Sequence, residues 1–372
     1  MNKHLHIVSF DIPFPADYGG IVDVYYKIKA LHQLGIKIHL HCFEYGREHQ
    51  KELNALCAEV FYYKRREGHK GFSLQYPYIV ASRNDDELWD RLNADEYPVL
   101  LEGVHCTYGL VTGKLTKKNV AIRLHNVEYA YYNQLCEWEK SLARKAYLHN
   151  ESRLLKRYEE QLKDYTIIAL SEKDAKQYRK EFKAKNVHHV PVFVNTNLVC
   201  SKEGLGTFAL YHGNLSVAEN EKAATWLLEK VFQDLEIPFV VAGKNPSKKL
   251  IEMAHKYPHT CIVENPSDAE MNDLISKAQL HVLPSFTTSG IKLKLLNALF
   301  NGRHVIANDE MLNGTGLEKA CLVANNATYF KYTILRLFQT PFTEEEKEAR
   351  QGYLNHEFNN EKHAEKLIQL LR

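Results

Sequence analysis

Two lysines at the start of an expected helix carry the clearest chemical signal in this sequence. They are Lys292 and Lys294, within the stretch LPSFTTSGIKLKLLNALFNG that begins at Leu283. The apolar residues of the helix recur at helical spacing, namely Ile291, Leu295, Ala298 and Leu299. Both lysines would fall in the first turn, where the helix dipole disfavours a cation by about 0.3 to 1 kcal/mol. An anionic ligand would compensate for this placement.

The residues just before these lysines have the types that hold a phosphate group. Thr288, Ser289 and Gly290 would open the helix. The amides of Ser289, Gly290 and Ile291 would then be free of helical hydrogen bonds, and free amides at the positive end of a helix can bind a diphosphate. The flanking lysines would add charge-assisted contacts. The alternative is that both lysine side chains extend into solvent.

A glycine pair and a histidine follow two strands of the expected first domain. Gly19 and Gly20 end the segment SFDIPFPADYGG and open a helical pattern, so their amides can hold a phosphate or a sugar hydroxyl. A tight turn is the alternative, because the pair is not the GxGxxG fingerprint. His125 ends the strand NVAIRLH, where an imidazole can donate to a phosphate or a hydroxyl. The alternative for this segment is structural, with Asn126 capping the next helix.

Two loops of the second half would face the same ligand as the lysines. Gly213 and Asn214 follow a strand in YHGNLS, and Gly243 and Lys244 follow another in VVAGKNPS. Each loop is equally compatible with a plain turn between a strand and a helix.

These residues require a scaffold of parallel strands. Short apolar runs alternate with longer amphipathic stretches, which is typical of strands joined by crossover helices. The runs form two series, so the sequence predicts two doubly wound α/β sheets. The first series begins at His6, Ile36, Glu59, Tyr97, Asn119 and Tyr165, with a seventh strand or a connector from Val187. The second begins at Thr207, Ile237, Thr260, Leu280, His304 and Ala320.

The polar stretch from Asn195 to Gly206 separates the two series and predicts a linker. We expect a first domain over residues 1–195 and a second over 196–357. The last segment, 358–372, has apolar residues at helical spacing, and we expect this helix to pack back on the first domain. Ligands of such sheets bind beyond the carboxyl ends of the strands, so two facing sheets would share one ligand in a cleft.

Composition excludes several classes of function. The 372 residues carry a formal net charge of +2 and no basic stripe, which argues against a nucleic-acid partner. The seven cysteines are scattered, and no DxD sequence or His/carboxylate cluster predicts a metal site. No long apolar run or signal peptide is visible, so we expect a cytoplasmic protein. The basic run from Lys64 to Lys70 is either a solvated loop or a peripheral contact with a membrane or an acidic glycan.

The sequence resembles the family 4 glycosyltransferases, which have the GT-B fold and usually transfer a sugar with retention of configuration. The resemblance spans nearly the whole chain. It rests on the PADYGG loop, on RLHNVE, on YHGNL and VVAG, and above all on PSFTTSGIKLKLLNALFNGRHVIA. It implies two facing Rossmann-like domains with mostly parallel sheets and a cleft between them. The SGIKLK loop is similar to the subgroup that has a Gly-rich loop in place of the first family Glu.

The resemblance assigns roles to individual residues. Gly20 would approach the donor phosphates and His125 would lie near the donor sugar. Catalytic candidates are His125, Lys292 and Ser289. Donor-binding candidates are Gly19, Gly20, Gly213, Asn214, Thr288, Ser289, Gly290, Ile291, Lys292, Leu293, Lys294 and Asn297.

The sequence departs from the family at four positions. Ser289 and Asn297 stand where the family commonly has two glutamates, the second of which holds the ribose. An amide at Asn297 can still pair with a ribose hydroxyl, about half as strongly as a carboxylate. Asn214 stands where the family has an arginine, and its lysine falls at Glu219 or Asn220. Lys292 and Lys294 would then replace these two phosphate-binding cations.

These features predict a hexosyltransferase that moves a sugar from a nucleotide-sugar donor to a glycan, a lipid-linked molecule or another hydroxyl acceptor, without a metal or other cofactor. Two alternatives stay open. One is a catalytically degenerate homologue that binds a nucleotide or acts as a scaffold. The other is an epimerase or hydrolase of nucleotide sugars with the same fold.

Overall fold

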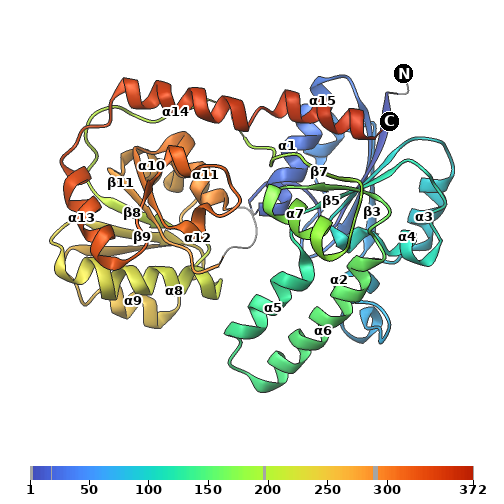
Figure 1. Ribbon diagram of the computed structural model, residues 1–372, viewed down its shortest axis with the longest axis horizontal. Helices are drawn as coiled ribbons and strands as arrows, with labels where there is room; N and C mark the ends of the chain where they lie inside the picture. Colours follow the sequence, from blue (N-terminus) through green and yellow to red (C-terminus); the bar gives the residue numbers. More distant parts are fainter. Residues whose placement is uncertain (1–2, 18, 196–197, 288–291, 372) are drawn as a thin grey trace. The chain divides into compact units, whose positions relative to one another are not determined.

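The protein is described by a computed structural model that covers residues 3–17, 19–195, 198–287 and 292–371. The chain divides into two compact units (Figure 1). The first unit comprises Met1–Asn195 and Phe358–Arg372, and the second comprises Thr196–Thr288 and Lys292–Glu357. Within the described residues, no helix is long and apolar enough to cross a membrane.

The first unit is built on a seven-stranded parallel sheet in the order β3-β2-β1-β4-β5-β6-β7. All runs predicted as strands in this half are strands, and the run from Val187 forms the seventh. The strands are β1 (His4–Ser9), β2 (Lys37–Glu44), β3 (Glu59–Lys64), β4 (Val99–Glu102), β5 (Val120–Leu124), β6 (Thr166–Ala169) and β7 (Val187–His189).

Helices cover both faces of this sheet because its side chains alternate between two apolar clusters. One cluster packs β1 and β2 against α1 and α15, through residues such as Ile7, Ile28 and Leu367. The other packs the opposite face against α3, α6 and α7, through residues such as Trp89 and Tyr158. The helices are α1 (Gly19–Gln33), α2 (Tyr78–Ala81), α3 (Asp86–Asn93), α4 (Tyr108–Thr112), α5 (Glu128–Trp138), α6 (Leu142–Glu160), α7 (Glu172–Glu181) and α15 (Asn360–Leu370).

The second unit has a six-stranded parallel sheet in the order β10-β9-β8-β11-β12-β13. Its strands are those predicted: β8 (Ala209–His212), β9 (Phe239–Gly243), β10 (Thr260–Glu264), β11 (Leu280–Leu283), β12 (His304–Ala307) and β13 (Leu322–Val323). Its helices are α8 (Ala218–Trp226), α9 (Lys248–Ala254), α10 (Asp268–Lys277), α11 (Leu293–Asn301), α12 (Asp309–Leu312), α13 (Ala327–Phe338) and α14 (Glu344–Glu357).

In both sheets the order in which strands are added reverses at the first strand, although all strands run parallel. In the first unit the chain builds outward from β1 to β3 and then returns to place β4 on the other side of β1. The second unit repeats this arrangement with β8 between β9 and β11. Ligands of open α/β sheets bind beyond the carboxyl ends of the strands at such a reversal. The two points to search are therefore the ends of β1 and β4 and the ends of β8 and β11.

A ladder of four histidines crosses β1 and β2 on the first sheet. His6 Nδ1 lies 2.9 Å from His41 Nε2, and His4 Nδ1 lies 2.9 Å from His39 Nε2. His6 and His41 form the inner pair, which is buried. His6 contacts Asp95, and His41 contacts the Tyr63 hydroxyl. Burial lowers the pKa of His41 well below its usual value, and burial also lowers the pKa of His6 despite the neighbouring Asp95. The inner pair is therefore neutral at physiological pH.

The ladder predicts that acid destabilises the first unit. Below pH 6.5 the unfolded chain binds protons that folded His41 does not, so the free energy of unfolding falls as the pH falls. Between pH 6.5 and 5.5, the free energy of unfolding should fall by about 1 kcal/mol less in His41→Gln than in the unchanged protein, measured by urea denaturation at both pH values. His32→Gln, at an exposed histidine, is the control and should keep the full pH dependence. An unchanged pH dependence in His41→Gln would contradict the prediction.

Candidate functional site

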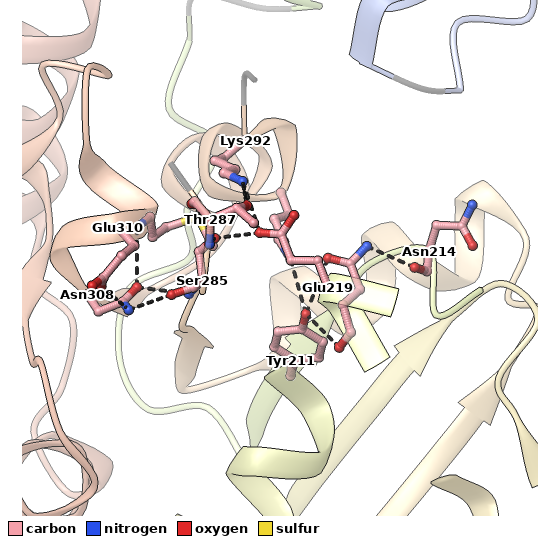
Figure 2. A network of polar contacts seen from close by, with 11 residues as sticks. Tyr211, Asn214, Glu219, Ser285, Thr287, Lys292, Asn308 and Glu310 are labelled. Carbon is pink, nitrogen blue, oxygen red and sulfur yellow. Dashed lines mark hydrogen bonds and ion pairs between the residues drawn. The ribbon is translucent and has the colours of Figure 1, made fainter. Parts of the chain in front are cut away.

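A polar network occupies the point of reversal of the second sheet (Figure 2). Its centre is the Glu219 carboxylate, in the first turn of α8. Lys292 Nζ lies 3.0 Å from Glu219 Oε1, and the Ser285 hydroxyl donates to the same oxygen over 2.5 Å. Lys292 also donates to the Thr287 hydroxyl over 2.9 Å. The ammonium group of Lys292 is therefore held in place by one partner from the loop after β11 and one from α8.

The burial of this ion pair makes it stronger than a surface pair. The side chains of Lys292 and Glu219 are only 9% and 18% exposed. Burial raises the pKa of the Glu219 carboxyl, but Lys292 and the hydroxyls of Ser285 and Thr287 outweigh it and lower the pKa below its usual value. Glu219 is thus charged at neutral pH and keeps Lys292 oriented.

The loop after β11 is fixed to the end of the neighbouring strand β12. The Asn308 side chain accepts from the Ser285 amide over 2.8 Å and donates to the Ser285 carbonyl over 2.6 Å. Asn308 is also the N-cap of α12, where it accepts from the Met311 amide. One side chain therefore holds the loop that carries the partners of Lys292.

Lys294 lies on a second branch of the same region. Its ammonium group donates to the Tyr211 hydroxyl over 3.1 Å and to Asn220 Oδ1 over 2.6 Å, and it lies 4.9 Å from the Tyr211 ring centre. Burial lowers the pKa of Lys294 to about 8, with Lys292 acting in the same direction and Glu219 opposing it. An anionic ligand would raise this pKa again, because it favours the charged form.

The structure corrects the expected start of the lysine helix. Helix α11 begins at Leu293, so Lys292 is its N-cap and only Lys294 lies in its first turn. The alternative in which both lysine side chains extend into solvent is wrong, because both make buried or half-buried polar contacts. Asn297 is exposed on α11. The predicted phosphate-binding residues Thr288, Ser289, Gly290 and Ile291 lie outside the described residues.

The loop after β8 brings Gly213 and Asn214 close to this network. Asn220 Nδ2 donates to the Asn214 carbonyl over 2.8 Å, and the exposed Asn214 side chain accepts from the amide and hydroxyl of Ser216. Gly243 contacts the same loop so closely that a Cβ atom there would lie 1.8 Å from the Gly213 carbonyl oxygen. The lack of a side chain at Gly243 is therefore required by packing. The exposed Lys244 follows directly.

The first unit has a second candidate site, at the reversal between β1 and β4. His125 Nε2 lies 2.9 Å from Glu102 Oε2, at the carboxyl end of β4. Its other nitrogen, Nδ1, is buried and has no hydrogen-bond partner within the described residues. A Cβ atom on Gly20 would lie 3.5 Å from this Nδ1 and 2.6 Å from the Phe10 ring. The Phe10 ring therefore leaves no room for a side chain at Gly20, and the backbone at the start of α1 lies close to His125 Nδ1.

Glu102 is part of a buried network of four charged side chains. Lys27 Nζ lies 2.6 Å from Glu102 and 2.9 Å from Asp23, and Arg123 forms two hydrogen bonds with Asp23 at 2.9 and 3.2 Å. All four residues are fully buried. Burial raises the pKa of Asp23, but Arg123 and Lys27 hold it well below its usual value. The two anions and two cations neutralise one another inside the unit.

This arrangement is a poor site for a metal ion. In the part of the chain that the structure describes, the group with suitable types and spacing is Asp23, Glu102 and His125. Lys27 already occupies the space between both carboxylates. A divalent ion would have to displace a buried ammonium group that is bonded to both.

A buried glutamate from α6 fixes the segment after His125. Glu159 accepts from the amides of Glu128 and Tyr129 over 3.1 and 2.9 Å, at the start of α5. The alternative in which Asn126 caps this helix is wrong, because the N-cap is Val127 and Glu159 of another helix accepts from the first amides. A side chain 31 residues away therefore sets the direction in which the chain leaves β5.

The chain is similar to known proteins in sequence. Residues 207–340 match a family model described as "Glycosyl transferases group 1". A Klebsiella pneumoniae protein described as an uncharacterized 44.6 kDa protein in a cps region is 26% identical over 352 residues, covering 88% of this chain and 89% of that protein. The family match lies in the second unit, which is therefore similar to the group 1 glycosyl transferases.

Solved structures with the same fold span almost the whole chain. Sucrose-phosphate synthase from Thermosynechococcus elongatus has a TM-score of 0.73 at 16% identity, over 99% of this chain and 98% of that one. TarM from S. aureus, in complex with UDP, fondaparinux and α-GlcNAc-glycerol, has a TM-score of 0.70 at 11% identity, over 100% of both chains. The chain has the GT-B fold. The predicted pair of Rossmann-like sheets is confirmed.

Sequence reasoning missed the residues that hold the site residues in place. Asp23 and Lys27 are four residues apart on the buried face of α1, and two charged residues among apolar ones were the available signal. Glu102 is the last residue of β4, whose four residues are all buried, and His125 directly follows β5. Glu219 was recognised only as the loss of a family cation, and no local pattern indicates its pairing with Lys292.

The buried network predicts a large loss of stability when one charge is removed. Asp23→Asn leaves Arg123 and Lys27 without their shared anion, which should cost about 3 to 5 kcal/mol of unfolding free energy in urea denaturation. Glu87→Gln is the control, because its ion pair with Arg91 is exposed and worth about 0.3 to 0.5 kcal/mol. Equal losses of unfolding free energy in the two variants would show that the buried network is no more stabilising than an exposed ion pair.

Proposed function

We propose that this chain is a metal-independent glycosyltransferase that moves a hexosyl group from a nucleotide-sugar donor to a hydroxyl acceptor, with retention of configuration. The observation that carries the proposal is the pair of held lysines, Lys292 and Lys294, at the reversal of the second sheet. This region lies within the stretch that matches the glycosyltransferase model. The acceptor is a glycan, a lipid-linked molecule or another hydroxyl compound of glycoconjugate synthesis.

The lysines are arranged to receive a diphosphate. An ammonium group has three N–H donors. Lys292 directs two of them to Glu219 and Thr287, and Lys294 directs two to Tyr211 and Asn220. Among the described residues, these contacts leave each lysine one donor for a phosphate oxygen, in a geometry that is set before the ligand binds. The amides of residues 289–291 would complete the phosphate site, and Asn297 on the exposed face of α11 would pair with the ribose.

His125 is assigned to the donor sugar. If Nε2 carries the proton that Glu102 accepts, Nδ1 is left with a lone pair and can accept from a sugar hydroxyl. If the ring is protonated, Nδ1 becomes a donor to a phosphate oxygen. In both forms Glu102 fixes the orientation of the ring, and Lys27 fixes Glu102.

The reaction then depends on position and electrostatics. The acceptor hydroxyl attacks from the face of the leaving group, and a donor phosphate oxygen takes its proton. The bond between the sugar and the nucleoside diphosphate breaks, and Lys292 and Lys294 stabilise the negative charge that develops on the diphosphate. The lysines thus perform the task that a divalent ion performs in metal-dependent transferases.

Binding of the donor nucleotide can be tested by thermal shift with UDP, GDP, ADP and CMP, each with and without EDTA. A nucleotide at a hundred times its dissociation constant stabilises the protein by about 2.7 kcal/mol. UDP is the first candidate, because the similar TarM structure is a complex with UDP. We expect one nucleotide to raise the melting temperature equally with and without EDTA. A shift that EDTA abolishes would contradict metal independence, and no shift with any nucleotide would favour a degenerate scaffold.

The role of the lysines predicts a loss of rate that can be separated from a loss of stability. Loss of a charge-assisted contact of about 1.5 to 3 kcal/mol should lower the turnover of Lys292→Ala by roughly 10- to 150-fold. Because Lys292→Ala leaves Glu219 without its cation, the double variant Lys292→Ala/Glu219→Gln should recover stability but not turnover. Lys277→Ala, at an exposed ion pair, is the control. Lys294→Ala should lose turnover in the same way, and full turnover in both Lys292→Ala and Lys294→Ala would remove both residues from the mechanism.

Product analysis without added acceptor separates the remaining alternatives. A transferase should leave the nucleotide sugar almost intact under these conditions. Rapid release of free sugar would indicate a hydrolase, and a new nucleotide sugar would indicate an epimerase.

A further inference from the structure

Arg65 differs from the other cations of the basic run that spans Lys64 to Lys70. Those other side chains are exposed, whereas Arg65 is partly buried. Its guanidinium lies 4.2 Å from the ring centre of Tyr45 and 5.3 Å from that of Tyr78, and its Nε donates to the Ser82 hydroxyl over 3.1 Å. The run is therefore not solvated throughout, because one of its arginines is fixed against two tyrosine rings.

The fixed guanidinium keeps most of its hydrogen-bonding capacity. A guanidinium group has five N–H donors, and the contact with Ser82 uses one of them. In the ranges that the structure describes, no carboxylate forms an ion pair with Arg65, and its two terminal nitrogens have no hydrogen-bond partner. Rings that stack on a guanidinium cover its faces and leave its edge for two parallel hydrogen bonds to a carboxylate or a phosphate. Arg65 is therefore prepared to bind an anionic group of a ligand.

Arg65 lies at the same edge of the first sheet as His125. Tyr45 directly follows β2 and Arg65 directly follows β3, just as Phe10 follows β1 and His125 follows β5. His105 comes three residues after β4. These strands are parallel neighbours in the order β3-β2-β1-β4-β5, so their carboxyl ends form one edge. The five residues therefore follow one another along the edge where ligands of such sheets bind.

Ring contacts and charge connect the residues along this edge. The Phe10 ring centre lies 5.2 Å from that of His105 and 5.2 Å from that of His125. His105 Nδ1 is buried and, like His125 Nδ1, has no hydrogen-bond partner within the described ranges. Burial lowers the pKa of His105 well below its usual value, and the charges of Arg83, His125 and Arg65 act in the same direction. Arg65 is therefore close enough to His105 to act on it, and His105 contacts the ring beside His125.

A third tyrosine lies near Arg65. Burial and the Glu151 carboxylate raise the pKa of Tyr147 to about 12, Tyr78 acts in the same direction, and Arg65 opposes them. The Tyr78 amide donates to Glu151 over 2.8 Å, which joins this part of α6 to α2. Tyr147 is 44% exposed and Tyr45 is 52% exposed. Both can pack their rings on a ligand, since tyrosine combines an apolar face with a polar hydroxyl.

We propose that Arg65 binds a carboxylate or phosphate group of an acidic oligosaccharide that serves as the acceptor. This inference rests on the proposed function, because it assigns the edge between Arg65 and His125 to the acceptor. The guanidinium forms two hydrogen bonds with the anionic group, and Tyr45 and Tyr147 pack on sugar rings. Between β3 and β5 lie four strand spacings, roughly 19 Å at about 4.8 Å each. The acceptor is therefore several sugar residues long, and its charge lies away from the hydroxyl that reacts.

The test measures the binding of oligosaccharides to the full chain by isothermal titration calorimetry, without nucleotide. Tetragalacturonate and a hyaluronan tetrasaccharide supply carboxylates, and a phosphorylated maltotetraose supplies phosphate. The methyl ester of tetragalacturonate supplies the same rings without charge. At least one acidic probe should bind ten times more tightly than the ester, and the stronger kind of anion identifies its source. Binding of no acidic probe, or equal binding of tetragalacturonate and its ester, would overturn the proposal.

Substitution of Arg65 separates a specific contact from the general charge of the basic run. Arg65→Gln should weaken binding of the acidic probe by roughly 10- to 150-fold. Arg65→Lys keeps the charge but not the planar fork, so it should restore little of the loss. The matched control is Arg66→Gln, at the adjacent exposed arginine, which should bind as the unchanged protein does. Equal losses in Arg65→Gln and Arg66→Gln would assign binding to diffuse charge and overturn the proposal.

Substitution of Tyr45 tests the same contact at an exposed residue. Tyr45→Ala should weaken binding by roughly 2- to 5-fold, because it removes a ring that holds the guanidinium, and Tyr45→Phe should not. The control is Tyr332→Ala, at a 64% exposed tyrosine of α13 in the second unit. Thermal unfolding of each variant shows whether it is folded. Unchanged binding in folded Tyr45→Ala and Arg65→Gln would contradict the inference.

Nucleotide binding distinguishes a failure of this inference from a failure of the proposed function. The thermal-shift panel of nucleotides does not involve the acceptor. A nucleotide shift without binding of any acidic oligosaccharide would overturn this inference alone. Binding of an acidic oligosaccharide without any nucleotide shift would keep Arg65 as a site for acidic glycans but contradict its role in a transferase.

Discussion

Both units depend on charges that are paired inside the protein at the carboxyl ends of their central strands. In the first unit Asp23, Lys27, Glu102 and Arg123 are fully buried, and each has an oppositely charged partner. An isolated charge in such a place would cost several kcal/mol, so the fold is stable only with the whole set. The position of His125 follows from this set, because its ring is bonded to Glu102. The site histidine is therefore placed by residues that need not touch a ligand.

The second unit also pairs charges at the carboxyl ends of its central strands, with fewer residues. The resemblance would have placed a cation at Glu219 or at Asn220. Glu219 is instead paired with Lys292, which comes from another element. The Lys292 ammonium group therefore lies where the strand order of the second sheet reverses, and Glu219 and Thr287 fix its direction. Under the proposed function, Lys292 would take the place of the cation that the family has at the start of α8. Lys294 adds a second ammonium group to this region, and burial lowers its pKa to about 8.

Rigid placement matters because metal-free stabilisation of a leaving diphosphate depends on donors that are in position beforehand. Donors that must reorganise during the reaction lose much of their effect, whereas held donors do not. Ser285, Thr287 and Asn308 connect two neighbouring strands to one lysine, which restricts its movement. Under the proposed function, these contacts would hold the lysine ready for the leaving diphosphate. In the first unit, His125 Nδ1 has no hydrogen-bond partner among the described residues and lies close to Gly20.

The sequence by itself determined the strands, their grouping into two series, and the class of the fold. Periodicity carries this information because a strand in a parallel sheet and its crossover helix have distinct apolar patterns. The sequence also singled out His125, Gly20 and the two lysines, because their types stand at the ends of strands and the starts of helices. Only the tertiary structure decided which residues hold them. Glu219 meets Lys292 across 73 positions, and Arg123 meets Asp23 across 100. Such pairs leave no periodic trace, since their spacing is set by the order of the strands in the sheet and not by the geometry of one element.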